Sequence, residues 1–353
     1  MKKALLVRLS SLGDVIFNIP LANVLQKNGY EVTWLVSEKG IDVVKDNPAV
    51  KNAVLIPLKK WKKNGFSIKN FFEFLKILQK LRKEHFDIAI DTQMMFKSML
   101  WMKFCGAKRR ICLKNGREFS SFGGNELIDP IPSPNFSVHA VFLHLAYAKY
   151  LGLEGADEVK FTLPATNDET KIKVDELLKN LDKSKPMVVI APATTRKLKH
   201  WNKENWRKVV DAISDKCSLV FTGGEGDNDL IAYISENKFL NLAGKTNIKD
   251  LIEIFSRAAL VMAPDSGSAH VARATNKPAV ISIFCCTPAS TYGPFGDDNK
   301  YFAVSGHLKC QPCHCTKKCP LVGDNAEQCV NYPKPDEIIN IVNKILQNYK
   351  HSV

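Results

Sequence analysis

The sequence predicts an α/β protein made of two domains, each a parallel sheet covered by helices. The chain has 353 residues, which exceeds the usual ~100–200 residues of one domain. Short apolar runs alternate with helical patterns in both halves, an order typical of parallel sheets. A polar stretch near residues 164–167 separates the halves. We therefore expect domains at residues 1–165 and 166–332, followed by a C-terminal segment, 333–353.

The expected elements follow from these runs. In the first half, we expect strands at residues 4–9, 31–36, 53–56 and 87–91, and helices at 14–27, 68–83, 97–104 and 138–151. In the second half, we expect strands at 187–191, 219–222, 240–242, 260–263 and 279–284. We expect helices at 203–216 and 227–237 and further helices between the last three strands. A last helix, 336–349, begins beside prolines, as helices often do. We expect it to pack back toward the first domain.

The composition favours a cytoplasmic protein with acidic partners. The apolar content of 45% is ordinary for a globular protein, and no apolar run approaches the ~18 residues of a membrane span. The apolar run after Met1 is broken at Arg8, which does not fit a signal peptide. The net charge of +14 favours phosphorylated molecules, nucleic acid or an anionic membrane. Residues 59–63, four lysines around Trp61, suit a lipid headgroup surface or a solvated loop.

The turn Ser10-Ser11-Leu12-Gly13-Asp14 joins a buried strand to a helix. Such turns lie at the carboxyl ends of parallel strands, where ligands bind. A helix start offers free N–H groups that suit an anion. The turn could therefore cradle a phosphate, or Asp14 could act chemically, or Asp14 could merely cap the helix.

A second polar loop follows the strand expected at 187–191. It contains Thr194, Thr195 and Lys199. The hydroxyl groups and the lysine charge could hold a diphosphate, and the alternative is an exposed basic loop.

The third segment, residues 263–270, again joins a strand to a helix. Here Ser266 and Gly267 are small enough to let a phosphate approach the helix start. Asp265 does not favour a phosphate by charge and better suits sugar hydroxyls. His270 could donate to a phosphate or pack in the core, and Asp265 or Ser266 could be only the helix cap.

Other nucleotide signals are weak or missing. Gly223-Gly224-Glu225 ends a strand, and its carboxylate could accept hydrogen bonds from ribose. The sequence has no P-loop motif, and no G-x-G-x-x-G follows the first strand, which argues against an NTPase of that class and a dinucleotide enzyme.

Five of the ten cysteines lie within residues 310–329. In a cytosolic protein this spacing favours a metal site over disulfides. Cys310, Cys313, Cys319 and Cys329 could form a structural zinc tetrahedron, with His314 and Cys315 as alternative ligands. A redox-sensitive thiol cluster and a disulfide stay open as alternatives, and we expect no catalytic metal.

The motifs at residues 10–14, 194–201 and 265–270 together resemble those of the ADP-heptose:lipopolysaccharide heptosyltransferases, glycosyltransferase family 9. The Cys-rich segment is similar to that of the heptosyltransferase II branch. The resemblance implies a GT-B fold, two Rossmann-like domains facing across a cleft that holds the active site. It also implies transfer of a sugar, with inversion, from a nucleotide diphosphate to the lipopolysaccharide inner core, with no cofactor required.

The resemblance also implies roles for single residues. Asp14 matches the general base, with Ser10, Ser11 and Gly13 in the acceptor-side loop. The residues implied on the donor side are Thr194, Thr195 and Lys199 at the diphosphate, Glu225 at the ribose, Thr246 at the adenine, Asp265 at the donor sugar, and Ser266, Gly267 and His270 near the phosphates.

The implied partners are ADP-heptose, a lipopolysaccharide core precursor and the anionic inner face of the cytoplasmic membrane, where the enzyme would be peripheral. One alternative is a family 9 enzyme with another nucleotide sugar or acceptor. A more distant alternative is a nucleic-acid-binding protein with a Cys-rich metal site, but the cations are spread over both domains. We therefore expect no nucleic acid partner.

Overall fold

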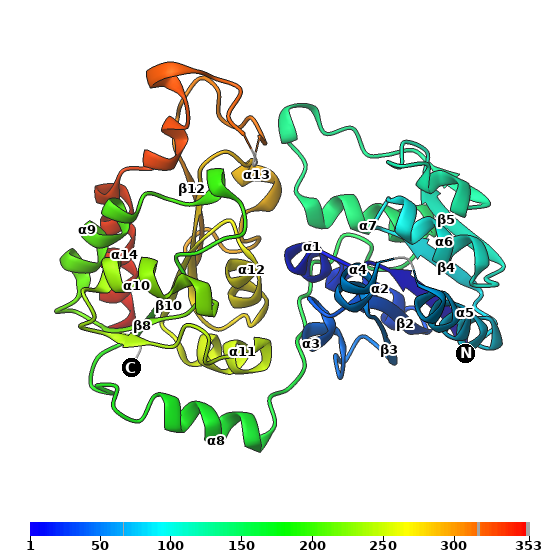
Figure 1. Cartoon of the computed structure of the whole chain (residues 1–353), viewed down its shortest axis with the longest axis horizontal. Coiled ribbons are helices and arrows are strands. Elements are labelled where there is room, and N and C mark those ends of the chain that lie inside the picture. Colours follow the sequence, from blue (N-terminus) through cyan, green and yellow to red (C-terminus); the bar gives the residue numbers. More distant parts are fainter. Residues whose placement is uncertain (66, 316–317, 351–353) are drawn as a thin grey trace. The chain divides into compact units, whose positions relative to one another are not determined.

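The computed structural model describes residues 1–65, 67–315 and 318–350 and divides the chain into two compact units, Met1–Ala165 and Thr166–Val353. Figure 1 shows each unit as a sheet with helices around it. The alternation of strands and helices expected from the sequence is confirmed.

In the described part of the first unit, six strands form one parallel sheet in the order β3-β2-β1-β4-β5-β6. This is the strand order of a Rossmann fold. The strands are β1 (Lys2–Val7), β2 (Tyr30–Ser37), β3 (Asn52–Ile56), β4 (Ile88–Asp91), β5 (Arg109–Leu113) and β6 (Glu126–Ile128). The helices are α1 (Leu12–Phe17), α2 (Ile19–Lys27), α3 (Ile41–Val44), α4 (Leu58–Asn64), α5 (Ile68–Lys83), α6 (Phe96–Phe104) and α7 (Ala140–Tyr150), with 3₁₀ turns at Ser120–Gly123 and Pro134–Phe136.

Both faces of the first sheet are covered. Leu5 and Leu6 are neighbours on β1, so they point to opposite faces, and both are fully buried. Leu81 of α5 and Trp101 of α6 pack on the face of Leu5. Helices α1 and α2 pack with α7 as a separate group.

The second unit repeats this plan. In its described residues the parallel strand order is β12-β11-β10-β7-β8-β9, the Rossmann order again. Figure 1 shows α9, α10 and α14 on one side of this sheet and α11 and α12 on the other. The strands are β7 (Met187–Ile190), β8 (Ser218–Phe221), β9 (Leu240–Asn241), β10 (Leu260–Pro264), β11 (Ala279–Phe284) and β12 (Tyr301–Ser305). The helices are α8 (Asp168–Leu177), α9 (Lys203–Ile213), α10 (Asn228–Ser235), α11 (Ile248–Arg257), α12 (Gly267–Ala274), α13 (Ala289–Tyr292) and α14 (Pro335–Lys350), with 3₁₀ turns at Lys197–Lys199, Glu225–Asp227, Gly323–Asn325 and Gln328–Asn331.

The C-terminal helix α14 packs against α9. Its side chains Ile338 and Val342 are fully buried in the apolar core that also contains Trp206 of α9. Its buried face therefore belongs to the core of the second unit, which differs from the packing toward the first domain that the sequence suggested.

Some elements differ from the sequence prediction. The helix expected at residues 14–27 is two helices that meet at Asn18, because Pro20 cannot continue the first helix past this point. Strands β5, β6 and β12 and helix α8 were not predicted. Helix α8 is largely polar, and its start is fixed by Asn167, whose side chain accepts a hydrogen bond from the Thr170 N–H.

Candidate active site

In each sheet, the predicted motifs follow strands at which the strand order reverses. Strand order reverses between β1 and β4 in the first sheet and between β7 and β10 in the second. At such switch points the loops beyond the carboxyl ends of the strands part and leave room for a ligand. The first motif follows β1, and the other two follow β7 and β10. Each unit therefore holds candidate residues at its own switch point.

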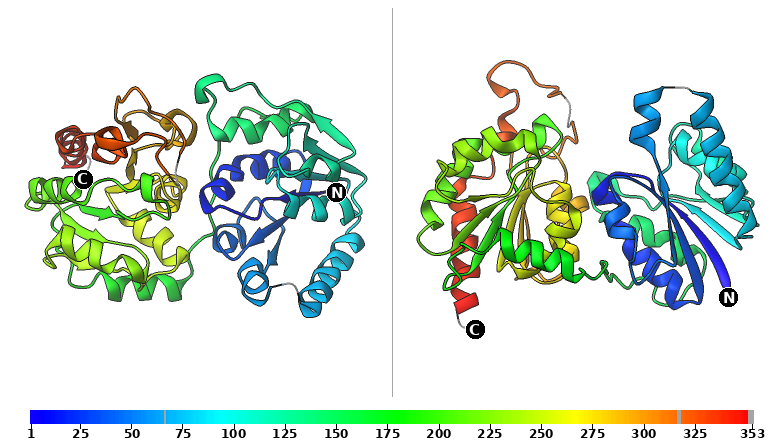
Figure 2. Two further views of the ribbon diagram at one scale, coloured as in Figure 1. Left: turned by 45° about the horizontal axis from the view of Figure 1, so that its top comes forward. Right: turned by 60° about the horizontal axis from the view of Figure 1, so that its bottom comes forward.

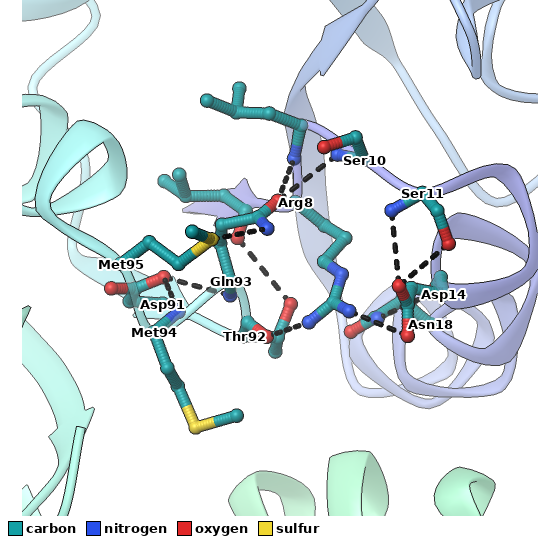
Figure 3. A network of polar contacts seen from close by, with 12 residues as sticks. Arg8, Ser10, Ser11, Asp14, Asn18, Asp91, Thr92, Gln93, Met94 and Met95 are labelled. Carbon is teal, nitrogen blue, oxygen red and sulfur yellow. Dashed lines mark hydrogen bonds and ion pairs between the residues drawn. The ribbon is translucent and has the colours of Figure 1, made fainter. Parts of the chain in front are cut away.

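In the first unit, Asp14 is fixed from two sides (Figure 3). Its Oδ1 atom lies 2.7 Å from Nη2 of Arg8, a residue whose side chain is 7% exposed. Its Oδ2 atom accepts hydrogen bonds from the N–H and the hydroxyl of Ser11, at 3.0 and 2.8 Å. The Asp14 side chain is still 32% exposed, so a ligand can reach the carboxylate.

The charge of Asp14 is stabilised by these contacts. Burial acts to raise the pKa of Asp14, but the Arg8 guanidinium and the hydrogen bonds from Ser11 outweigh it and lower this pKa from 3.8 to about 2. Burial and the nearby Arg8 charge lower the pKa of His144 to about 3, so this histidine is neutral at pH 7. Asp14 is therefore the ionised acid of this site.

The turn before Asp14 is anchored to the loop after β4. The Oε1 atom of Gln93 accepts hydrogen bonds from the N–H groups of Leu9 and Ser10, at 2.9 and 3.0 Å. Arg8 also donates a hydrogen bond to the carbonyl of Thr92. Because Gln93 is 4% exposed, these bonds are shielded from water. The loops after β1 and β4 thus form one unit around Arg8.

A second carboxylate, Asp91, lies behind this loop. It is 1% exposed and accepts hydrogen bonds from the N–H groups of Gln93 and Met94 and from the hydroxyl of Ser98. Burial raises the pKa of Asp91 to about 6 despite these bonds. Its carbonyl also accepts a hydrogen bond from Tyr147. Asp91 therefore holds the loop after β4 in place through these hydrogen bonds and is shielded from solvent.

In the second unit, Lys199 and Asp265 form an ion pair, with Nζ 2.6 Å from Oδ2. Asp265 is 3% exposed, and its carboxylate also accepts a hydrogen bond from Thr287 at 2.7 Å and lies 3.6 Å from Nε2 of His270. Burial acts to raise the pKa of Asp265, but His270 and Lys199 together hold it well below its usual value. Asp265 therefore fixes the positions of Lys199 and His270 at the end of β10.

The other predicted residues of the loops after β7 and β10 lie around Lys199 and Asp265. The hydroxyl of Thr194 donates to the carbonyl of Asp265 at 3.4 Å, and His200 Nε2 contacts the Thr194 carbonyl at 2.6 Å. Thr195 is exposed. Ser266 precedes α12, and in the described part of the chain its buried Oγ atom has no hydrogen-bond partner.

The loops of Glu225 and Thr246 lie side by side. The N–H of Gly244 donates to the carbonyl of Gly223 at 3.0 Å. Gly244 has φ +75°, and a Cβ atom there would meet the Cα of Glu225 at 3.2 Å. Glycine is thus required for this close approach. The carboxylate of Glu225 is exposed beside it.

The cysteine segment gives two corrections. All ten cysteines are free thiols, so the disulfide alternative is wrong. No three His, Cys, Asp or Glu side chains are grouped as metal ligands in the described residues, so the expected zinc tetrahedron is not seen there. Instead, the thiols line one small pocket together with leucines and Glu327; the cysteines of this pocket are Cys286, Cys310, Cys313, Cys319 and Cys329.

Three contributors were not predicted: Arg8, Gln93 and Thr287. The sequence signal for Arg8 was its position directly after an apolar strand, where a buried cation needs a partner. Gln93 follows β4 in the same way, and Thr287 follows β11.

The model of a family described as glycosyltransferase family 9 (heptosyltransferase) matches residues 74–321. Lipopolysaccharide core heptosyltransferase OpsX of Haemophilus influenzae is 28% identical over 290 residues, which are 79% of this chain and 78% of that protein. Other curated relatives are named lipopolysaccharide heptosyltransferase 1 and 3.

Solved structures share the fold. A family 9 glycosyl transferase from Veillonella parvula has a TM-score of 0.77 and 17% identity, with 98% of this chain and 97% of that chain covered. E. coli ADP-heptose lps heptosyltransferase II has a TM-score of 0.70 and 18% identity, with 99% and 100% covered. The expected GT-B fold is confirmed, whereas a specific tie to the heptosyltransferase II branch stays a prediction.

Proposed function

We propose that this chain, which belongs to glycosyltransferase family 9 and is therefore a glycosyltransferase, moves heptose from ADP-heptose to the inner core of lipopolysaccharide. The names of its relatives support both substrates: OpsX is a lipopolysaccharide core heptosyltransferase, and heptosyltransferase II is named for ADP-heptose. The transfer would invert the anomeric carbon in a single displacement.

One observation carries this proposal. A reachable carboxylate, Asp14, lies at the switch point of one Rossmann sheet, and a cation, Lys199, lies at the switch point of the other. A displacement at a sugar carbon needs a proton acceptor on the acceptor side and positive charge at the leaving group. The chain offers one of each, on separate units.

Asp14 would act as the general base. Its carboxylate would take the proton from the acceptor hydroxyl while that oxygen bonds to the anomeric carbon. With a pKa of about 2, Asp14 is a weak base toward a free hydroxyl. The hydroxyl becomes far more acidic as its bond to carbon forms, so proton transfer late in the step suffices. Ser10, Ser11 and Gly13 would shape the acceptor side of this turn.

Lys199 would stabilise the departing ADP. As the bond between the anomeric carbon and the diphosphate oxygen breaks, negative charge grows on the diphosphate. Lys199 is held by buried Asp265 and is 21% exposed, so its ammonium group is pre-positioned for this charge. Thr194, Thr195 and His270 would bind further oxygens of the phosphates.

The start of α12 would hold a phosphate oxygen. Its first backbone N–H groups are free of helical partners by geometry, and Gly267 allows close approach. The buried hydroxyl of Ser266, with no partner in the described residues, offers one more donor there. Asp265 could contact the donor sugar only by exchanging one of its present partners.

The nucleoside would occupy the adjoining loops. The exposed carboxylate of Glu225 would accept hydrogen bonds from the ribose hydroxyls, and Thr246 would lie at the adenine. The enzyme would work in the cytoplasm at the inner face of the cytoplasmic membrane, because its acceptor is lipid-linked. We propose no nucleic acid partner.

The test is a matrix of donors and acceptors. Purified protein is offered ADP-heptose, ADP-glucose or UDP-glucose with a set of truncated core acceptors. We expect transfer from ADP-heptose to an inner-core acceptor, with the new linkage of inverted configuration by NMR. Transfer from another nucleotide sugar alone would instead favour the alternative family 9 activity.

A further inference from the structure

Helix α5 has exposed apolar side chains beyond those of its buried face. On its inner side, Leu78 and Leu81 are buried in the core of the first unit. On its outer side, Ile68 is 74% exposed and Phe72 is 63% exposed. A helix of a globular protein normally exposes a polar face opposite its buried face. The outer side of α5 therefore presents apolar area that the fold of the unit does not use.

This outer side forms a groove with the neighbouring helix. Phe71 and Leu75 of α5 line it together with Phe104 of α6, and each of these side chains is at least 40% exposed. Both views of Figure 2 show α4 and α5, in light blue, at the outside of the first unit. We call these five side chains and the cations of α4 and α5 the basic–aromatic surface.

The surface is strongly positive. Residues 58–83 contain nine Lys or Arg and one acid, Glu73. That acid is already engaged, since its carboxylate accepts hydrogen bonds from Lys60 and from the indole N–H of Trp61. The groove itself is lined by Lys76, Arg82 and Lys83 beside the aromatic rings.

Exposed apolar side chains flanked by lysines are typical of helices that lie in a membrane interface. The rings enter the boundary of the acyl chains, while the long cationic side chains reach the headgroups. In the described residues, no helix is long and apolar enough to cross the bilayer. The surface thus suits attachment rather than insertion across the membrane.

We propose that the basic–aromatic surface docks the enzyme on an anionic phospholipid bilayer. Charge complementarity selects this occupant over a second copy of the chain. A symmetric dimer through this surface would bring two sets of nine cations against each other, which like-charge repulsion opposes. The inference rests on the proposed membrane location and adds the surface responsible for it, but it does not depend on sugar transfer.

The test is sedimentation of the full chain with vesicles of phosphatidylglycerol and phosphatidylethanolamine, or of phosphatidylcholine alone. We expect binding to the anionic vesicles, weak binding to phosphatidylcholine, and release at high salt, because ~1 M salt shortens the screening length to ~3 Å. Ile68→Ser and Phe72→Ser should each weaken anionic vesicle binding roughly tenfold, by loss of buried apolar area. The control Ile172→Ser, on α8 of the second unit, removes a side chain that is 68% exposed and should bind like the wild type.

The cations are tested separately. Lys76→Glu with Lys83→Glu should abolish the preference for anionic vesicles, whereas Lys208→Glu, on α9, should not. Wild-type protein that stays in solution with anionic vesicles would overturn the proposal. So would vesicle binding unchanged by Phe72→Ser, or a dimer in sedimentation velocity that this variant dissociates.

A delipidated core acceptor separates this proposal from the proposed function. With this water-soluble acceptor, Phe72→Ser should transfer heptose as fast as the wild type. Loss of transfer by Phe72→Ser on the soluble acceptor would overturn the docking role. Failure of the wild type to transfer any heptose, with vesicle binding intact, would count against the proposed function alone.

Discussion

The Nη2 atom of Arg8 lies 2.7 Å from the Oδ1 atom of Asp14, at the carboxyl end of β1. The guanidinium is buried and also donates to the carbonyl of Thr92, so it is fixed before any ligand arrives. This pair keeps Asp14 ionised and orients one of its oxygens, while Ser11 orients the other. Arg8 is thus a positioning residue for the proposed base.

Replacing Arg8 should change the pH profile of the enzyme. In Arg8→Met, the charge of Arg8 is gone while burial and the hydrogen bonds from Ser11 remain, so the pKa of Asp14 should rise from about 2 toward 3.8. The acidic limb of kcat/KM should then move up by about one to two pH units and enter the measurable range. Arg8→Lys retains a cation and should shift less. An acidic limb that is the same in Arg8→Met and the wild type would contradict this role.

Asp91 should make the free energy of unfolding fall as the pH rises. An acid whose pKa is lowered by an ion pair has the opposite effect. Its pKa is raised to about 6 in the folded chain, so the folded state favours the protonated form. The stability it gives is present below its unfolded pKa, near 4, and is lost as the pH rises through 6. The free energy of unfolding should fall by roughly 2–3 kcal/mol over this range from Asp91 alone.

The measurement is urea unfolding at pH 4 and pH 8. The amide of Asp91→Asn cannot titrate, so this variant should lose the Asp91 part of the pH dependence. Its free energy of unfolding, relative to that of the wild type, should therefore be higher at pH 8. The control is Asp87→Asn, which removes an acid from an exposed ion pair four residues earlier in the sequence. Equal pH dependence in Asp91→Asn and the wild type would rule out the raised pKa.

Lys199 should matter for both donor use and folding. Lys199→Ala removes the charge proposed for the leaving diphosphate, and kcat/KM for ADP-heptose should fall about 10²–10³-fold. It also leaves buried Asp265 without its lysine, which should cost roughly 3 kcal/mol of stability. Lys197→Ala, which removes a 72% exposed lysine two residues earlier, should leave both nearly unchanged. Wild-type kinetics in Lys199→Ala would remove its role at the diphosphate.

Gln93 should support the acceptor-side turn without touching substrate. Gln93→Ala leaves the N–H groups of Leu9 and Ser10 without their acceptor, a loss of about 1–3 kcal/mol. Because the turn carries Asp14, kcat should fall while KM for ADP-heptose stays near the wild-type value. Gln93→Glu keeps an acceptor oxygen for these N–H groups but adds a charge at a buried position, so it should restore kcat only in part. Gln26→Ala, at an exposed site on α2, controls for the loss of a glutamine.

The sequence predicted the fold and the positions of the motifs, because strand ends carry polar residues after apolar runs. It did not predict β5, whose Arg109 and Arg110 interrupt the apolar pattern. Pro20 signalled the break between α1 and α2 at Asn18. The sequence prediction nevertheless joined the two helices, because the apolar periodicity continues on both sides of Asn18.

The pairs within the site were not predictable from local sequence. Gln93 lies 83 residues from Ser10, and Asp265 lies 66 residues from Lys199. These contacts depend on β1 lying next to β4 and on β7 lying next to β10. Strand order sets them, and a single sequence read along the chain does not give that order.

The most direct test of the proposed mechanism is the turnover of Asp14→Asn with saturating ADP-heptose and an inner-core acceptor. The amide is nearly isosteric with the carboxylate but accepts no proton, so kcat should fall about 10²–10⁴-fold while affinity for ADP is retained. Asp42→Asn, which removes an acid from the first turn of α3, should react like the wild type. Turnover of Asp14→Asn near the wild-type value would contradict the assignment of Asp14 as the base.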